Sequence, residues 1–85
     1  MKTGWLRVGC TVEVMVHPDV NRIWHHIRGV VRRIDHHTDA VTIYFANSPG
    51  NNGRPHMHDL SIGFVKTRCK LVAGVATNYG MEDDV

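Results

Sequence analysis

Histidine is the residue type in this 85-residue chain that could most readily bind a metal, and the chain contains seven. His56 and His58 are two positions apart, so both imidazoles would point to the same side of a strand. Zinc takes four ligands as a rule, and the sequence suggests only His25 or His26 as a further ligand. We therefore expect no bound cofactor, with zinc at His56 and His58 as the alternative.

Basic side chains form a second group, which could bind phosphate. Lys66, Arg68 and Lys70 occupy alternate positions, so in an extended segment they would form a stripe on one face. Three arginines of an earlier segment and a tyrosine that could stack on a base would extend this surface. The hypothetical nucleic-acid site consists of Arg28, Arg32, Arg33, Tyr44, Lys66, Arg68 and Lys70. The alternative interpretation is the solvated outer face of a sheet.

A third group lies in two polar loops, over 18–26 and 46–55, and suits a protein partner. Trp24 stands among polar residues, and tryptophan is enriched at the centres of protein interfaces. Nearby arginines could form charge-assisted hydrogen bonds with acidic groups of a partner. The predicted protein-binding residues are Arg22, Trp24, His25, His26 and Arg54. In the alternative interpretation Trp24 only covers one end of the core.

The chain lacks the residue patterns typical of catalysis. It has no glycine-rich phosphate loop, no G-x-S-x-G motif and no H-E-x-x-H motif. Its two cysteines, Cys10 and Cys69, are far apart, and no spacing places a histidine beside either. We expect two reduced thiols, although a disulfide could form if the first and last strands bring their Cα atoms within about 7 Å. The sequence predicts a protein that is not an enzyme.

The composition is that of one folded domain, with 42% hydrophobic and 21% charged residues. The net charge is +2, but without Glu82, Asp83 and Asp84 ten Lys and Arg stand against five Asp and Glu. The body is therefore moderately basic, below the dense charge of a dedicated nucleic-acid binder. No apolar segment approaches the ~20 residues of a membrane span, and no secretory signal is visible, so we expect a cytoplasmic protein without membrane contact.

The hydrophobic periodicity predicts five short strands. Val12, Val14 and Val16 alternate with other residues and predict a first strand, which Pro18 ends. In the second strand, Gly29 or a bulge would permit a sharp bend. The expected strands cover 11–16, 27–35, 40–45, 56–60 and 64–69. Turn-forming residues predict a hairpin tip over 36–39 and a short 3-10 turn over 61–63.

Strands this short are stable only if their apolar faces meet, which predicts an all-β, five-stranded small barrel whose first and last strands pair. The barrel would span 1–72, with a flexible acidic tail over 73–85. The predicted core consists of Val12, Val14, Val16, Val31, Ile34, Val41, Ile43, Phe45, Leu60 and Phe64.

Four segments carry a resemblance to a known fold: Leu6–Gly9, Gly29–Asp35, Val41–Phe45 and His58–Leu60. In this order they resemble SH3-like barrels, including KOW and Tudor-type modules and the photosystem I subunit IV family with its ferredoxin-handling relatives. The resemblance implies the fold and leaves the function open. We expect a non-catalytic module that binds a protein partner. The alternatives are a nucleic-acid-binding module and, from the small size alone, an inhibitor protein encoded by a phage or mobile element.

Overall fold

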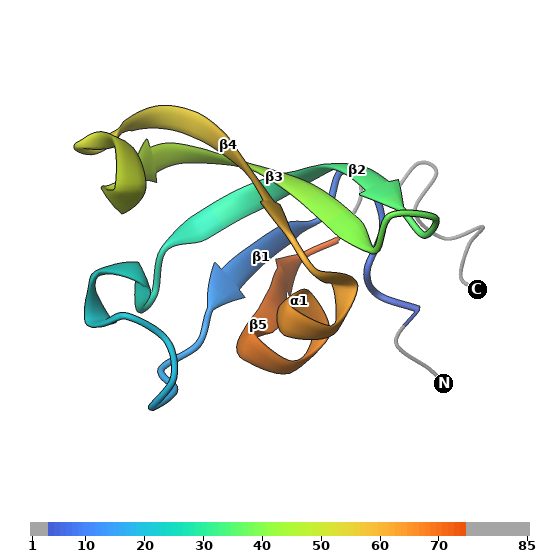
Figure 1. Ribbon diagram of the computed structural model, residues 1–85, viewed down its shortest axis with the longest axis horizontal. Helices are drawn as coiled ribbons and strands as arrows, with labels where there is room; N and C mark the ends of the chain where they lie inside the picture. Colours follow the sequence, from blue (N-terminus) through green and yellow to red (C-terminus); the bar gives the residue numbers. More distant parts are fainter. Residues whose placement is uncertain (1–3, 75–85) are drawn as a thin grey trace.

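The computed structural model describes residues 4–74, which form one five-stranded antiparallel sheet and a short helix (Figure 1). The strands are β1 (Thr11–Val14), β2 (Arg28–Asp35), β3 (Ala40–Ser48), β4 (Arg54–Leu60) and β5 (Cys69–Ala73). Helix α1 (Ile62–Arg68) joins β4 to β5, and two 3-10 turns, η1 (Arg22–Trp24) and η2 (Pro49–Asn51), interrupt the two long connections. The fold is therefore mostly β, as predicted. Apart from Ala73 and Gly74, the expected acidic tail lies outside the described residues.

The sheet is open. Its strand order is β4-β3-β2-β1-β5. The predicted pairing of the first and last strands is confirmed, with Val12 opposite Leu71 and Val14 opposite Cys69. Within residues 4–74, however, β4 pairs only with β3 and β5 only with β1, so the predicted closure is wrong for the hydrogen-bonded sheet. The sheet curves instead, and β4, β3 and β2 arch over β1, β5 and α1 (Figure 1).

The segment after β4 differs most from the prediction. The expected 3-10 turn over 61–63 and strand over 64–69 are wrong, because α1 occupies this segment and the last strand begins at Cys69. Ser61 Oγ accepts the N–H of Phe64 at 3.0 Å, and Asp39 Oδ1 accepts the N–H of Ile62 at 3.2 Å. These two bonds satisfy N–H groups that have no partner within the first turn of a helix. Capping by Ser61 and by Asp39 thus favours the helix over a strand.

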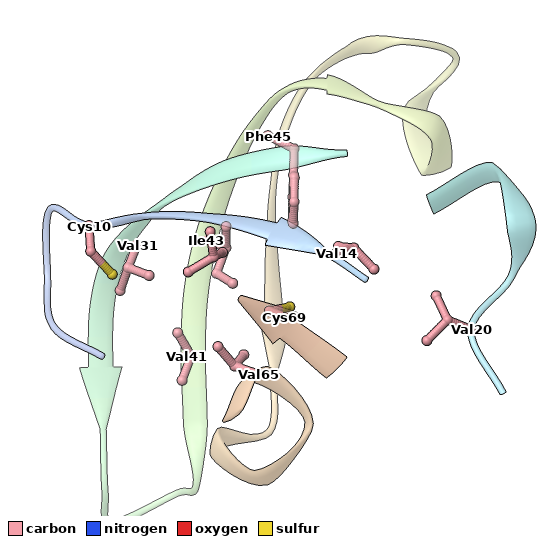
Figure 2. Packing of buried hydrophobic residues seen from close by; sticks show 10 residues of the cluster. Cys10, Val14, Val20, Val31, Val41, Ile43, Phe45, Val65 and Cys69 are labelled. Carbon is pink, nitrogen blue, oxygen red and sulfur yellow. The ribbon is translucent and has the colours of Figure 1, made fainter. Parts of the chain in front are cut away.

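Ten buried apolar residues form the core of the described region (Figure 2). They are Cys10, Val12, Val14, Val20, Val31, Val41, Ile43, Phe45, Val65 and Cys69. Of the other predicted core residues, Ile34, Leu60 and Phe64 are half-buried against this core. The prediction for Val16 is wrong, since its side chain is 62% exposed. Strand β1 ends at Val14, two residues before Val16, and the chain then turns away toward Pro18.

Strand β2 contains the predicted irregularities. Gly29 is buried opposite Val12, and a Cβ atom there would lie 2.5 Å from Cγ2 of Ile43 and 2.8 Å from the ring of Phe45. The register with β3 shifts between Val31 and Arg33, which is a bulge. Together they allow β2 to pass close over the core side chains of β3 while the sheet bends.

The predicted hairpin tip over 36–39 is confirmed between β2 and β3. Asp35 Oδ1 accepts the N–H groups of His37 at 2.9 Å and Thr38 at 3.3 Å, and these backbone bonds lower the pKa of the Asp35 carboxyl. Asp39 closes the turn in the left-handed region at φ 55°. Across the part of the chain described, helices are too short and too polar to cross a bilayer.

Candidate protein-binding pocket

A pocket of about 340 Å³ opens between the β1–β2 connection and the inner side of β4. Nine residues from four elements and this connection line it: Val14, Asp19, Val20, Asn21, Trp24, Phe45, His58, Leu60 and Phe64. Its lining is mostly apolar, and its volume falls at the lower end of the roughly 300–1,000 Å³ typical of ligand sites. The pocket is therefore large enough for one bulky side chain or a small molecule.

Three aromatic rings build one wall of this pocket. The ring centroid of Trp24 lies 5.1 Å from that of Phe45 and 5.0 Å from that of His58, and Phe45 and His58 are 5.7 Å apart. All three contacts are edge-to-face, a geometry that contributes about 0.5–1.5 kcal/mol per pair beyond burial. Phe45 is fully buried and Trp24 is half-buried. Trp24 is thus a fixed wall that can receive a partner's side chain.

The turn η1 positions Trp24. Asn21 Oδ1 accepts the N–H of Ile23 at 3.2 Å, which caps the turn, and the N–H of Trp24 donates to the Asn21 carbonyl at 2.9 Å. His26 then adopts a left-handed backbone at φ 68° and donates its N–H to the carbonyl of Val14 at 2.8 Å. The connection is therefore tied back to the end of β1. Ile23, next to Trp24, remains 56% exposed.

His58 joins the pocket wall to the core. Its Nε2 atom lies 2.8 Å from Oγ of Ser48, which is fully buried. Burial lowers the pKa of the His58 imidazole, and the neighbouring His56 lowers it further. The two rings lie on the same side of β4, as predicted, with centroids 4.8 Å apart. At neutral pH the wall formed by His58 is therefore uncharged.

The zinc hypothesis gains no further ligand from the described residues. No group of three or more His, Cys, Asp or Glu side chains converges anywhere in residues 4–74. His25, one suggested ligand, has its Nε2 atom 3.1 Å from the carbonyl of Val20, and the Nδ1 atom of His26 lies 3.0 Å from Glu13 Oε2. A zinc site at His56 and His58 thus stays a prediction with two candidate ligands.

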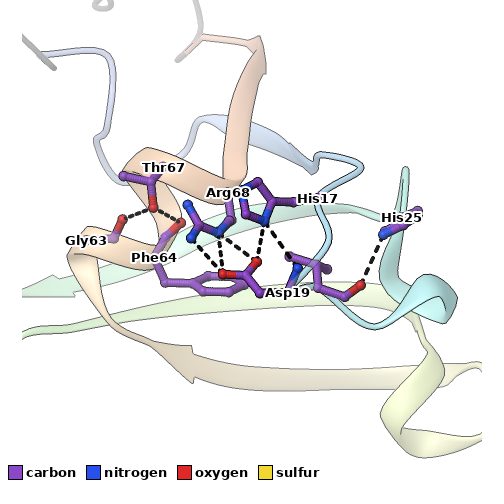
Figure 3. A network of polar contacts seen from close by, with 8 residues as sticks. His17, Asp19, His25, Gly63, Phe64, Thr67 and Arg68 are labelled. Atoms are coloured by element: carbon purple, nitrogen blue, oxygen red, sulfur yellow. Dashed lines mark hydrogen bonds and ion pairs between the residues drawn. The ribbon is translucent and has the colours of Figure 1, made fainter.

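A charged pair lies where the pocket meets α1 (Figure 3). Arg68 donates from Nε to Asp19 Oδ1 at 2.8 Å and from Nη2 to Oδ2 at 2.6 Å, and His17 Nδ1 lies 2.5 Å from Oδ1. The hydrogen bonds from Arg68 lower the pKa of the Asp19 carboxyl to about 2, and Asp19 in turn raises the pKa of Arg68. Asp19 therefore carries a charge that a bidentate guanidinium already matches.

The predicted nucleic-acid residues are spread over four elements, β2, β3, α1 and β5. Lys66 and Arg68 lie on α1 and Lys70 on β5, so the stripe expected on an extended chain is wrong. Arg68 is occupied by Asp19. On the outer face of the sheet, Lys70 and Arg28 flank Glu13 in neighbouring strands.

The cations of that outer face mostly have partners. Arg28 Nε donates to Glu13 Oε1 at 2.9 Å, and hydrogen bonds from His26 and then Arg28 lower the pKa of Glu13. Arg33 Nη2 lies 3.2 Å from Asp35 Oδ2. The Arg32 guanidinium lies over the ring of Tyr44, 5.4 Å from its centroid. These contacts reduce the charge and the aromatic surface available to a polyanion.

The predicted protein-binding residues are brought together only in part. Arg22, Trp24 and His25 lie in the connection that forms the pocket, and Arg54 begins β4 at the same end of the sheet as η2. His26 instead turns to Glu13 on the outer face. Val14, Phe45, Leu60 and Phe64 were predicted as core residues and not as part of a binding site. Their convergence on one pocket depends on strands and a helix that are distant in sequence.

Both cysteines are free and buried. Cys69 begins β5 opposite Val14, whereas Cys10 directly precedes β1 and lies four residues before Val14. At about 3.3 Å per residue this separation is about 13 Å, beyond the reach of a disulfide. Burial raises the pKa of Cys10 and raises that of Cys69 to about 11, so both are protonated thiols at neutral pH.

Comparisons with protein-family models, with curated proteins and with solved structures find no match to this chain.

Proposed function

We propose that this protein is a non-catalytic interaction module that binds a protein partner in the pocket between the β1–β2 connection and β4. The observation that carries the proposal is an open, largely apolar pocket with Trp24, Phe45 and His58 as one wall. Rigid aromatic walls that meet edge-to-face lose little freedom when they bury another side chain. Such a pocket gains free energy by covering an apolar group of a partner.

Exposed groups beside the pocket favour a protein over a free small molecule. Ile23 is 56% exposed directly beside Trp24, and Val16 is 62% exposed in the same connection. Neither Arg22 nor Arg54 forms an ion pair with any of residues 4–74. Apolar side chains and available arginines around an apolar centre are typical of protein interfaces.

We also propose that the open sheet is a variant of the SH3-like barrel. Three observations support it: the meander of β1 to β4, the pairing of β5 with β1, and a short helix between β4 and β5. In this arrangement the β1–β2 and β3–β4 connections lie near each other, as the approach of Gly50 to Trp24 and His58 indicates. The pocket would then occupy the mouth of the barrel.

The test is a substitution that fills the pocket without removing a wall. Leu60 is half-buried and lines the pocket, so Leu60→Phe would place its added ring atoms in the space meant for the partner. Leu71→Phe is the matched control, because Leu71 is 41% exposed on the edge strand β5, away from the pocket. Capture of a protein from the native host should be lost with Leu60→Phe and retained with Leu71→Phe.

Two results would contradict this proposal. One is equal capture by the wild type and both variants at matched thermal stability. The other is retention of oligonucleotides that weakens steeply with salt and is unaffected by Leu60→Phe, which would favour the nucleic-acid alternative.

A further inference from the structure

The charge around the pocket restricts what its occupant can be. Asp19 is the acidic residue of the lining, and Arg68 and His17 already contact its two carboxylate oxygens. A cationic side chain entering the pocket would have to compete with a bidentate guanidinium for the same oxygens. It would also leave Arg68 without its partner. Aromatic rings can attract cations. Here, however, the carboxylate of Asp19 is already paired with Arg68 and offers a cationic ligand no free negative charge.

The remaining walls are mostly apolar. The ring of His58 meets Trp24 and Phe45 edge-to-face, and its Nε2 atom is already engaged by Ser48 Oγ at 2.8 Å. Apart from Asn21, the other lining residues are apolar: Val14, Val20, Leu60 and Phe64. An uncharged, bulky side chain therefore loses the least hydration and gains the most contact on entering.

The surface beside the pocket, unlike the pocket itself, favours charged groups of a partner. Arg22 belongs to η1, between the lining residues Asn21 and Trp24, and it is exposed. Arg54 is exposed at the start of β4, opposite Ser48, whose hydroxyl contacts His58. Because neither arginine is paired within the described residues, carboxylates of a partner could bind both at little desolvation cost.

We propose that the pocket takes one large uncharged apolar side chain, aromatic or aliphatic, from a protein segment whose neighbouring residues are acidic. This inference rests on the proposed protein-binding function and specifies the chemistry of the partner. The apolar side chain would supply most of the affinity, and the acidic neighbours would supply orientation and discrimination against basic segments.

Three synthetic pentapeptides test this inference by titration into the ¹⁵N-labelled full chain, with the indole N–H of Trp24 as the reporter. Their sequences are Ac-Asp-Glu-Trp-Glu-Asp-NH₂, its charge-reversed form Ac-Lys-Lys-Trp-Lys-Lys-NH₂, and Ac-Asp-Glu-Lys(Me₃)-Glu-Asp-NH₂. We expect the acidic tryptophan peptide to shift the Trp24 signal and to bind about tenfold more tightly than the charge-reversed peptide. The trimethyllysine peptide should leave the signal unchanged.

A charge-reversed protein supplies the second arm. With Arg22→Glu and Arg54→Glu together, the preference between the two tryptophan peptides should invert. Both residues are exposed, so the fold should be retained, as the dispersion of the spectrum would show.

Three results would overturn the inference. The first is tighter binding of the trimethyllysine peptide at the Trp24 signal, and the second is equal or tighter binding of the basic peptide. The third is no shift with any peptide at millimolar concentration. The first two leave a protein-binding pocket with a different partner chemistry. The proposed function itself is judged by the Leu60→Phe capture experiment, so the two failures are distinguishable.

Discussion

The ion pair between Asp19 and Arg68 joins residues 49 positions apart in the sequence. It attaches the β1–β2 connection to α1, the two parts of the chain that meet beside the pocket (Figure 3). Arg68 is largely covered, with 26% of its side chain exposed, whereas 55% of the Asp19 side chain is exposed. We infer that this pair holds the connection, and with it Trp24, at a fixed distance from α1.

Replacing Asp19 with Asn should change how the stability of the fold depends on pH. The pKa of Asp19 is lowered from 3.8 to about 2, so the ionised carboxylate stabilises the fold fully above pH 4. That contribution is lost as the pH falls from about 4 to about 2. The wild type should therefore unfold at higher urea concentration than Asp19→Asn at pH 6, and the two midpoints should converge near pH 2.

Arg68→Met is the companion variant, because it removes the other partner. It should reduce the midpoint at pH 6 and show the same convergence. A difference between wild type and Asp19→Asn that stays constant from pH 6 to pH 2 would contradict the role given to this pair.

His58 should make the pocket sensitive to mild acid. Its pKa is lowered below 6.5 in the folded protein, so between that lowered value and 6.5 the unfolded chain binds more protons. Stability attributable to His58 is therefore complete above pH 6.5 and falls below it. The groups around the ring are His56, Ser48, Trp24 and Phe45.

The measurement compares the free energy of unfolding of the wild type with that of His58→Phe between pH 7.5 and pH 5.5. The advantage of the wild type should shrink as the pH falls, because phenylalanine does not titrate. His58→Phe also loses the contact with Ser48, which changes the free energy of unfolding by the same amount at every pH. Combining His58→Phe with Ser48→Ala would reduce this constant difference. A pH-independent difference would show that protonation of His58 is not coupled to folding.

Strand β2 depends on the missing side chain of Gly29. A methyl group there would clash with Ile43 and with the Phe45 ring, and Phe45 is part of the aromatic wall. Gly29→Ala should destabilise the protein by about 1–3 kcal/mol, the usual cost of overpacking a core. It should also shift the Trp24 indole signal, since Phe45 would have to move.

Gly63→Ala is the matched control for this prediction. Gly63 lies in α1, and a Cβ atom there has no neighbour within 4 Å. The substitution should stabilise the helix by up to about 1 kcal/mol. Equal effects of the two substitutions on the urea midpoint would contradict the packing argument.

Strands were predictable where side chains alternate, and the helix was not. The alternation of Val41, Ile43 and Phe45 placed β3 correctly, and the polar residues over 36–39 placed its hairpin. Helix α1 takes one of its two caps from Ser61 and the other from Asp39, a residue of a distant turn, and no local pattern reveals the bond to Asp39. The predicted stripe of Lys66, Arg68 and Lys70 was wrong for the same reason, because it assumed a strand where the helix forms.

The whole molecule is a curved sheet whose two edge strands do not meet, and the pocket lies beside one of those edges. The sequence indicated the β1–β2 connection and Trp24 as part of a protein-binding surface. It indicated Phe45, Leu60 and Phe64 only as core residues and His58 only as a metal ligand, because the pocket forms only when four elements and this connection converge. A site assembled across elements leaves little trace in any single segment.

The most direct test of this surface is photo-crosslinking in the native host. A benzoyl-phenylalanine at position 23, beside the pocket, is compared with one at position 71 on the far edge strand, since both side chains are exposed. We predict one discrete crosslinked protein from position 23, lost when Leu60→Phe is added, and none from position 71. Crosslinks from position 71 alone, or no protein crosslinked from position 23, would contradict the claim that this pocket binds the partner.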